Sequence, residues 1–413
     1  MFVQQVSESS LVSLFVIAAC AMAAPLLSAL TRKRVPDVVW LLVLGVLVGP
    51  YGLGWAGLGE GVSMVRELGL GLLFLLAGFE VETGSLRGRQ GRWAALTWIA
   101  CLGVGWAVAA VALPGTTSQA SLALAICVTS TALGTLLPIL KEAGAAPTPL
   151  GRAVLIHGAV GELGPVVTMS VLLGSRSATT TAVVFAIFVV GALLAALVPA
   201  RLASALPSLT RVIVRGTNTT SQTMVRVVFL LLTALMALTA VLGLDVVLGA
   251  FAAGAIVRIF VPRDDRALER KLNTVGFSFL IPVFFVASGM AIDIGVVARM
   301  WPLVLGLLLL ILVARGVPVW LAERLADTGS EIGAPRDQVR LGLYSAAGLP
   351  IIVAVTDLAV AEGLMSQDIA SALVAAGAAT VLLFPLVAHL LIGRDGSAIR
   401  RARGAREAAT GTR

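Results

Sequence analysis

Residues 151–173 read GRAVLIHGAVGELGPVVTMSVLL, an apolar run long enough to cross a bilayer, with one carboxylate, Glu162, at its middle. A charged side chain at the centre of a bilayer costs roughly 3 kcal/mol on insertion scales, and more in simulations. Acidic residues in such segments are therefore rare, and they usually belong to ion or proton pathways. The alternative is a protonated carboxyl group that is hydrogen-bonded to a neighbouring helix.

The composition of the whole chain is that of a polytopic helical membrane protein. Of its 413 residues, 58% are hydrophobic and 13% are charged, and the mean hydropathy is +1.00. The apolar runs lack strict alternation, which excludes a transmembrane β-barrel. The net charge of +8 could suggest nucleic acid, but basic loops that set the membrane topology explain it better. The three cysteines lie inside apolar runs without metal-ligand spacing, so we expect no zinc site, disulfide framework or cofactor.

The apolar runs predict thirteen membrane spans, with the N-terminus outside and the C-terminus in the cytoplasm. In this arrangement the 30 Lys and Arg residues, except Arg66, Arg176, Arg299 and Arg315, fall in inner loops or in the C-terminal tail. Such a bias follows the positive-inside rule. The predicted spans are 11–30, 35–54, 62–81, 93–113, 119–140, 151–173, 180–199, 225–243, 246–260, 274–292, 300–322, 338–360 and 369–392.

The first six spans and the last six resemble two copies of one unit. GLLFLLAGFEVE (71–82) is similar to PVFFVASGMAID (282–293), and LVLGVLVGP (42–50) is weakly similar to VVLGAFAAGA (246–255). TSTALG (129–134) occupies the place of YSAAGLP (344–350). Chance similarity between apolar helices is the alternative, but the three matches occur in the same order. The seventh span would give the copies opposite orientations, and inverted repeats are typical of secondary transporters.

The fifth and twelfth spans both contain residues that interrupt a helix near the middle of the membrane. Proline removes a backbone donor and clashes with the preceding turn. Ordinary proline kinks are the alternative, but matched interruptions in two repeats predict discontinuous helices whose free ends and carbonyls line an ion site. The interrupting residues are Thr129, Ser130, Thr131, Gly134 and Pro138 in the fifth span and Ser345, Gly348 and Pro350 in the twelfth.

The eleventh span carries a second charge, Arg315, about as deep in the membrane as Glu162. Arginine stays protonated at any relevant pH, so it needs a partner or water. Either Arg315 snorkels to the cytoplasmic surface, or it pairs with Glu162, with a carbonyl of a broken helix, or with both.

The chain resembles the monovalent cation/proton antiporter superfamily, in the branch of bacterial sodium/proton antiporters and potassium-efflux systems. The resemblance covers about residues 11–392. It implies an all-α membrane fold of about 13 helices, with inverted repeats and two crossing broken helices. It also implies a homodimer in the plasma membrane that exchanges Na⁺ or K⁺ for H⁺. The stretches that carry it are VPDVVWLLVLGVLVGP (35–50), ELGLGLLFLLAGFEVE (67–82), TSTALGTLLPILKEAG (129–144), VLGAFAAG (247–254) and IPVFFVASGM (281–290).

The resemblance also assigns the site, with one departure. Members of the family carry Asp-Asp, Asn-Asp or Gln-Asp where this chain has Gly161-Glu162, so Glu162 takes the place of the ion-binding aspartate. Arg315 matches the basic residue of the family. His157 stands where some members carry an acid that pairs with that arginine, so His157 is either a core donor or a second proton-linked group.

The hypothesis that follows is that Glu162 binds either one proton or one monovalent cation. Thr129, Ser130, Thr131 and Ser345 would supply oxygen ligands, and a single carboxylate predicts electroneutral exchange. Within a membrane domain of residues 1–393, a panel (about 11–54 and 225–260) would face a core (about 62–175 and 274–393). A basic cytoplasmic tail would follow at 394–413.

Three other functions remain open from the sequence. The first is a proton-coupled exporter of an organic cation or metabolite on the same scaffold, for which the glycine at 161 leaves room. The second is a membrane enzyme that uses His157 and Glu162, although the sequence offers no second catalytic cluster. The third is a passive channel, which no repeated filter motif supports.

Overall fold

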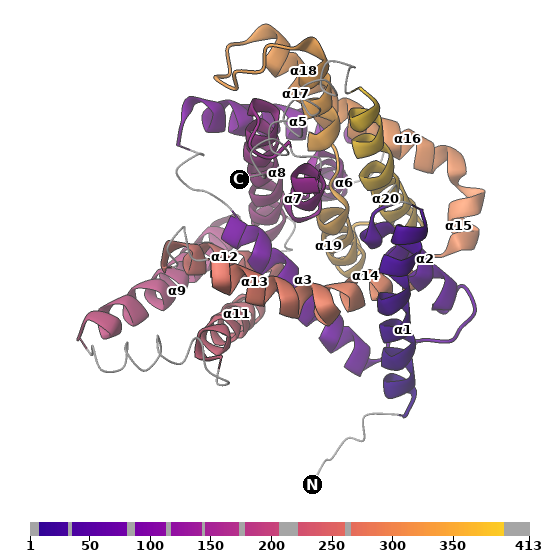
Figure 1. Cartoon of the computed structure of the whole chain (residues 1–413), viewed down its shortest axis with the longest axis vertical. Helices are drawn as coiled ribbons and strands as arrows, with labels where there is room; N and C mark the ends of the chain where they lie inside the picture. The colour runs from indigo at the N-terminus through magenta and orange to yellow at the C-terminus, as the bar shows by residue number, and fades with distance from the viewer. Residues whose placement is uncertain are drawn as a thin grey trace, which may run out of the picture.

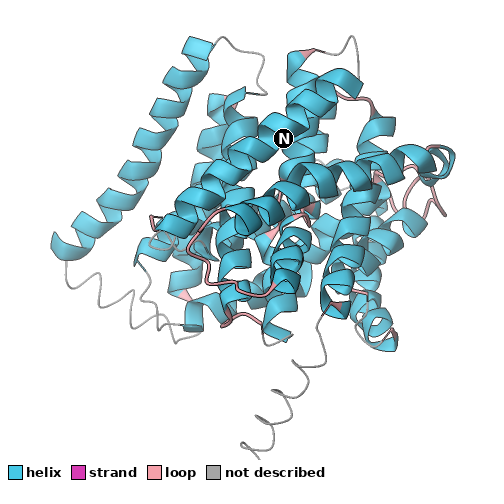
Figure 2. Ribbon diagram, turned by 90° about the horizontal axis from the view of Figure 1, so that it is seen from above, coloured by secondary structure: helices cyan, strands magenta, loops and turns pink. Residues whose placement is uncertain are grey.

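The computed structural model describes residues 8–31, 35–80, 87–112, 117–142, 145–172, 178–205, 222–260 and 266–391. The regular elements of these residues are all helical (Figures 1 and 2). They are α1 (Glu8–Leu30), α2 (Asp37–Val48), α3 (Glu60–Glu80), α5 (Arg89–Ala112), α6 (Ser118–Thr129), α7 (Leu133–Glu142), α8 (Pro149–Leu172), α9 (Ala178–Ala205), α11 (Thr223–Leu242), α12 (Val246–Phe260), α13 (Arg266–Val275), η1 (Gly276–Leu280, a π-helix), α14 (Ile281–Met290), α15 (Ile294–Arg299), α16 (Trp301–Ile311), η2 (Leu312–Gly316, a π-helix), α17 (Val317–Leu325), α18 (Pro335–Ser345), α19 (Leu349–Ala361) and α20 (Gln367–Leu390).

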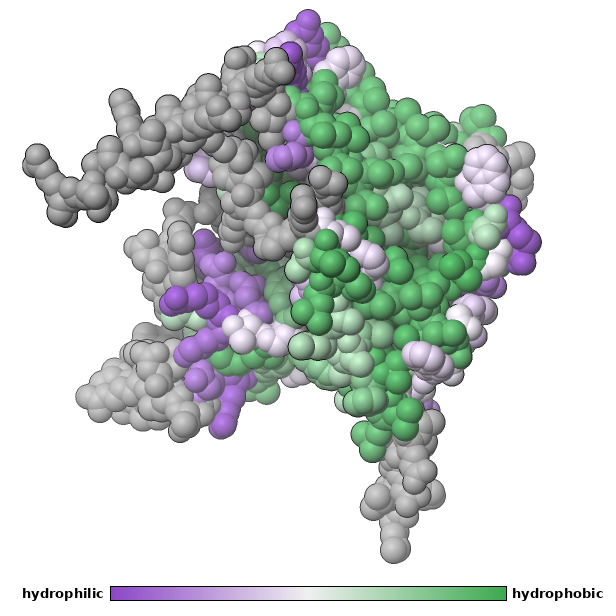
Figure 3. Space-filling model, turned by 45° about the vertical axis from the view of Figure 1, so that its right-hand side comes forward, coloured by the Kyte–Doolittle hydropathy of each residue, from purple (hydrophilic) through white to green (hydrophobic). Residues whose placement is uncertain are grey.

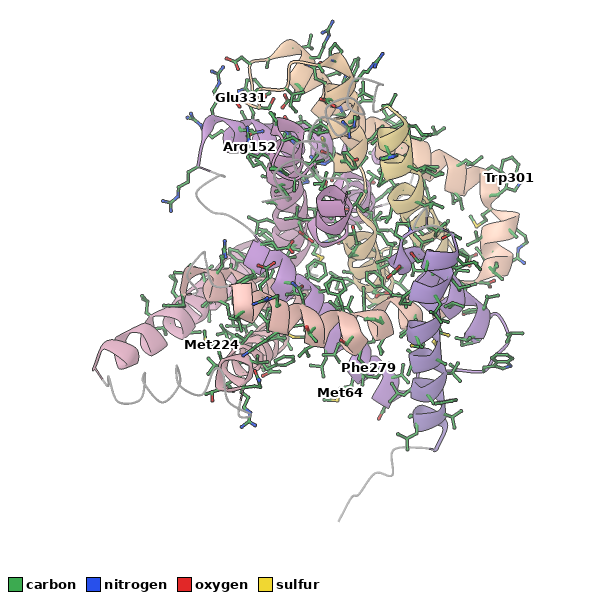
Figure 4. All side chains as sticks on the ribbon, in the orientation of Figure 1. Met64, Arg152, Met224, Phe279, Trp301 and Glu331 are labelled. Carbon is green, nitrogen blue, oxygen red and sulfur yellow. The ribbon has the colours of Figure 1, made fainter. Side chains whose placement is uncertain are left out.

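Each predicted span contains helix in the described part of the chain. Within the described ranges, nine helical segments are long and apolar enough to cross a membrane, and the remaining predicted spans fall on shorter apolar helices. The surface is correspondingly apolar over a broad face (Figure 3). Met64, Phe279 and Trp301 are exposed on the outside of the bundle (Figure 4). The polytopic helical class is therefore confirmed, while the number of crossings stays a prediction.

The helices form two groups (Figure 1). In one, α5, α6 and α8 pack together and against elements of α16–α20. In the other, α2 packs on α14, and α12 packs on both α3 and α11. From sequence we assigned 62–81 and 274–292 to the core, but as α3 and η1–α14 these two segments pack mainly with α2 and α12. This packing favours the panel for both segments, and the division into panel and core stays a proposal.

Glycines explain the packing of α2 on α14. A Cβ atom on Gly45 would lie 2.1 Å from the carbonyl oxygen of Val286, and one on Gly289 would lie 2.3 Å from that of Leu42. Real Cβ atoms do not approach this closely, so both positions require glycine. Small residues that let backbones touch are how helices associate in a membrane, where lipid is as apolar as leucine.

The packing of α3 on α12 repeats this arrangement. A Cβ atom on Gly254 would lie 1.9 Å from the carbonyl oxygen of Leu75, and one on Gly78 would lie 2.1 Å from that of Phe251. Gly78 and Gly289 are matched in the sequence repeat, so each half of the chain supplies one partner to both contacts. In the sequence repeat α2 corresponds to α12 and α3 corresponds to α14, so the α2–α14 contact corresponds to the α12–α3 contact.

A methyl group at this contact should destabilise the protein. Gly254→Ala is expected to lower the unfolding free energy by about 1–3 kcal/mol, because the backbones of α3 and α12 must separate. Gly306→Ala on α16 is the matched control, since a Cβ atom there meets nothing within 4 Å. Thermal unfolding in detergent measures both. Equal unfolding temperatures for the two variants would contradict the packing argument.

Both predicted helix interruptions are present. Residues 130–132 separate α6 from α7, and residues 346–348 separate α18 from α19. The two breaks lie against each other, because the Ala132 N–H donates to the Ala347 carbonyl at 2.7 Å and the Ser130 hydroxyl to the Gly348 carbonyl at 3.3 Å. Backbone groups freed by each break are thus partly satisfied by the other, as a low-dielectric interior requires.

Candidate functional site

Glu162 lies on α8, beside the break between α6 and α7. The Glu162 residue is 3% exposed. The backbone N–H of Leu133, the first residue of α7, forms a hydrogen bond with the Glu162 carboxyl group. The atom Oε2 has no hydrogen-bond partner among the described residues. The N-terminal end of a helix carries partial positive charge, so α7 stabilises the carboxylate, while the second oxygen is left for another ligand.

Arg315 lies in the π-helix η2 and is fully buried. Its Nε donates to Thr131 Oγ1 at 3.1 Å, and its Nη2 donates to the His157 carbonyl at 2.9 Å. Its Nη1 lies 3.8 Å from Cys101 Sγ. The snorkelling interpretation is therefore wrong, because these three contacts hold the guanidinium inside the bundle. Of the partners predicted from sequence, Arg315 contacts the break between α6 and α7 through the Thr131 side chain. Its carbonyl partner is His157 of α8 and does not belong to a broken helix.

The glycine at 161 is explained by the position of this guanidinium. A Cβ atom on Gly161 would lie 2.4 Å from Thr131 Oγ1 and 2.6 Å from Arg315 Nη2. The space that a side chain at 161 would need is thus filled by Thr131 and Arg315. Among the described residues Arg315 contacts Thr131, Cys101 and the His157 carbonyl and forms no ion pair with Glu162, and position 161 has no room for a second acid.

The four predicted hydroxyl ligands differ in what they contact. The Thr131 hydroxyl donates to the Ser345 carbonyl, and the Thr131 N–H donates to the Gly161 carbonyl at 2.9 Å. The Thr129 hydroxyl donates within its own helix to the Ala125 carbonyl at 2.7 Å. The Ser345 hydroxyl has no partner among the described residues. Thr131 therefore contacts Gly161, the residue before Glu162, and the roles of all four side chains as cation ligands stay predictions.

Two acids lie near the site, and the sequence assigned neither of them a role in it, Glu80 because it falls at a span end where a solvated role is expected. Glu80, at the end of α3, acts electrostatically on Glu162. Glu323 on α17 lies 3.9 Å (Oε1) from His157 Nε2. The sequence contained a signal for Glu323, because it follows Arg315 by two helical turns and so lies on the same helix face.

A cavity of about 330 Å³ approaches the site between the two helix groups. It is lined by residues of α1, α2, α3, η1, α14 and α7, among them Asp37, Leu73 and Thr135. Thr135 lies two residues after Leu133, whose backbone N–H forms the hydrogen bond with the Glu162 carboxyl group. The cavity therefore extends to the first turns of α7, close to the break beside Glu162.

A second charged cluster joins the two helix groups away from this cavity. Arg66 of α3 forms an ion pair with Asp357 of α19. Asp245 precedes α12, where its Oδ1 accepts the Val247 N–H at 2.8 Å. Burial raises the pKa of Asp245 to about 6, and the charges of Asp357 and Glu67 act in the same direction.

This pKa predicts a pH-dependent stability. Because the folded pKa of Asp245 lies above its ordinary value of 3.8, the folded state binds more protons between these values, and stability falls as the pH rises through that window. Asp245→Asn keeps an acceptor for Val247 but no charge, so above pH 6 it should be more stable than wild type by up to about 3 kcal/mol. Chemical unfolding at pH 4 and pH 7 measures this. An equal difference at both pH values would contradict the assignment.

Comparison with known proteins gives one family. A family model described as "Sodium/hydrogen exchanger, transmembrane" matches residues 15–391. The putative Na⁺/H⁺ antiporter YjbQ of Bacillus subtilis is 26% identical over 94% of this chain. A probable Na⁺/H⁺ antiporter 3 of Methanocaldococcus jannaschii is 24% identical over 88% of the chain. The glutathione-regulated potassium-efflux protein KefC of Salmonella schwarzengrund is 26% identical over 91% of it.

The coverage of these relatives differs. The chain spans 64% of the length of YjbQ and 60% of KefC, but 93% of the archaeal protein. Among solved structures, the sodium proton antiporter MjNhaP1 from M. jannaschii at pH 8 superposes with a TM-score of 0.62. That match covers 91% of this chain and 95% of the other at 16% identity, so it shows the fold.

Proposed function

Since this chain belongs to the sodium/hydrogen exchanger family, we propose that it is a secondary active antiporter that exchanges a monovalent cation, Na⁺ or K⁺, for H⁺. The observation that carries the proposal is the environment of Glu162. This acid is buried between interrupted helices, and one of its oxygens has no hydrogen-bond partner among the described residues. The relatives named as Na⁺/H⁺ antiporters and potassium-efflux proteins support a cation as substrate and do not favour an organic cation or metabolite.

The mechanism is competition for Glu162. The free carboxylate oxygen binds a proton or a dehydrated cation, and binding of one excludes the other. The Leu133 N–H at the start of α7 holds the first oxygen in place in both cases. Carbonyls freed at the two breaks, together with Thr131, Thr129, Ser130 and Ser345, would complete the oxygen shell that a hard monovalent cation prefers.

The charge balance follows from Arg315 and Gly161. Arginine does not release its proton at physiological pH, and position 161 has no room for a second acid. Glu162 then carries one charge per cycle, so one cation exchanges for one proton and the exchange is electroneutral. His157 and Arg315 serve as supporting charges.

Alternating access would come from the core moving against the panel. The mirrored glycine contacts of α2–α14 and α3–α12 support two inverted repeats, which in transporters rock around a midplane site. In this proposal the Arg66–Asp357 pair must open when the core moves, because it joins α3 to α19. We further propose a homodimer in the cell membrane, with the N-terminus outside. The proposed basic cytoplasmic tail, 394–413, lies outside the described residues.

The test uses vesicles that contain the purified protein and a pH-sensitive dye. Addition of Na⁺, K⁺ or Li⁺ should move protons over a range of pH, and the responding ion identifies the substrate. Clamping the membrane potential with valinomycin and potassium during Na⁺ or Li⁺ exchange should leave the rate unchanged, because exchange is electroneutral. A rate that follows the potential would contradict the one-for-one stoichiometry.

A further inference from the structure

A second buried pair of ionisable groups lies outside the ion site. Glu323 and His157 have side chains that are 2% and 1% exposed, and His157 Nε2 lies 3.9 Å from Glu323 Oε1. The carboxylate is held by two donors, the hydroxyl of Thr328 at 2.9 Å and that of Ser330 at 2.5 Å. Neither ring nitrogen of His157 has a hydrogen-bond partner among the described residues. The imidazole thus faces a fixed acid with both nitrogens unused.

This pair has its own opening to the surface. The loop after α17 encloses a cavity of about 300 Å³ that is lined by residues 326–333 and by Glu323. Two ion pairs anchor the loop, Arg89 with Asp327 at 3.0 Å and Arg152 with Glu331 at 3.2 Å. Arg152 and Glu331 lie together at the end of the bundle that carries this loop (Figure 4). A proton can therefore reach Glu323 through the loop cavity without passing Glu162.

The pair is also tied to the ion site. His157 and Glu162 lie on α8, while Arg315 and Glu323 lie on the continuous helix η2–α17. The backbone carbonyl of His157 accepts a hydrogen bond from Arg315 Nη2 at 2.9 Å. The two helices are thus joined both at Arg315 and at Glu323. A charge on the imidazole acts on Arg315, whose Nη2 lies beside Gly161, the residue before Glu162.

We propose that His157 and Glu323 form a second proton-binding site, reached through the 326–333 loop cavity, whose protonation sets the affinity of the Glu162 site for its cation. The second half of this statement rests on the proposed function. With a proton on His157 the pair is neutral. Without that proton it carries one negative charge, which attracts a cation to the nearby site.

The other charges around the pair are compensated or constant. Arg315 from η2 keeps its charge at all relevant pH. On α18, Arg340 pairs with Asp337 at 2.7 Å. At the rim, Asp327 and Glu331 are paired with Arg89 and Arg152. The net charge of the His157–Glu323 pair is therefore the charge that changes with pH. At acid pH the KM for the cation should rise by more than the protonation of Glu162 alone would cause.

Two variants should move this KM in opposite directions. His157→Gln leaves the negative charge of Glu323 in place, so the KM at acid pH should be about tenfold lower than in wild type. Glu323→Gln leaves no negative charge, so the KM at alkaline pH should be about tenfold higher. A purely structural role of the pair would shift both variants the same way, and that result would overturn the coupling to the ion site.

The proton site itself is tested without transport. The chain has two histidines, so His389→Gln leaves His157 as the single one. Nitrogen-15 NMR of histidine-labelled protein in liposomes should show the imidazole changing charge between pH 5 and pH 9, with a different midpoint after Glu323→Gln. An imidazole that keeps one charge state from pH 5 to pH 9 would overturn the proposed proton-binding site. A titration midpoint that is unchanged by Glu323→Gln would overturn it as well. If the pair titrates but the protein shows no antiport, the proposed function is refuted while the proton-binding site stands.

Discussion

Glu162→Gln is expected to reduce cation-driven proton movement to the background of vesicles without the protein. The amide has nearly the same size as the carboxylic acid, and its oxygen can keep the hydrogen bond from the Leu133 N–H. It can neither bind a proton at working pH nor supply a negative charge to a cation. The measurement is dye-detected proton movement on addition of the cation that wild type transports.

The matched control is Glu362→Gln, which makes the same chemical change on an exposed residue at the end of α19. It should exchange at the wild-type rate. Glu162→Asp should keep a reduced rate, since a carboxylate remains but is withdrawn from the break. Wild-type exchange by a folded Glu162→Gln protein would end the mechanism, because no other described residue is assigned the shared site.

Arg315→Met should both inactivate and destabilise the protein. Removing the guanidinium leaves Thr131 Oγ1 and the His157 carbonyl without their buried donor. We expect a loss of about 2–5 kcal/mol of unfolding free energy, since buried groups that lose a charged partner pay their desolvation cost. Exchange should fall to background, because Thr131 and the α8 backbone at His157, on either side of the acid site, lose the guanidinium that joins them. Unfolding in detergent and the dye assay measure the two effects.

Two further variants separate charge from position. Arg299→Met removes an exposed arginine from α15 and should change neither quantity. Arg315→Lys keeps the charge but cannot donate to Thr131 and His157 in the same fork, so it should be intermediate in stability. Full activity and stability of Arg315→Met would show that the guanidinium is not part of the site.

The sequence predicted features that depend on local chemistry. The two breaks follow from clusters of hydroxyl, glycine and proline residues that disfavour a continuous helix, and both are present at 130–132 and 346–348. The burial of Glu162 follows from its place in an apolar run. These predictions needed no knowledge of which helices touch.

Features that depend on the relative placement of helices could not be predicted from the sequence. Gly78 and Gly254 bring α3 onto α12, a contact that requires the two glycines to face each other in space, and the placement of α3 in the core or the panel stays a proposal. The snorkelling alternative for Arg315 was wrong for the same reason. Its partner at His157 is the backbone carbonyl, while the imidazole faces Glu323, and residue spacing alone cannot distinguish these orientations.

The most direct test of a shared carboxylate is to count protons released when a cation binds. Calorimetric titration of the purified protein with the transported cation, in buffers of different ionisation enthalpy, gives this number. We predict about one proton released per cation bound, and an apparent Kd that rises about tenfold for each pH unit of acidification while Glu162 is protonated. Cation binding without proton release, or unchanged binding by Glu162→Gln, would contradict the account.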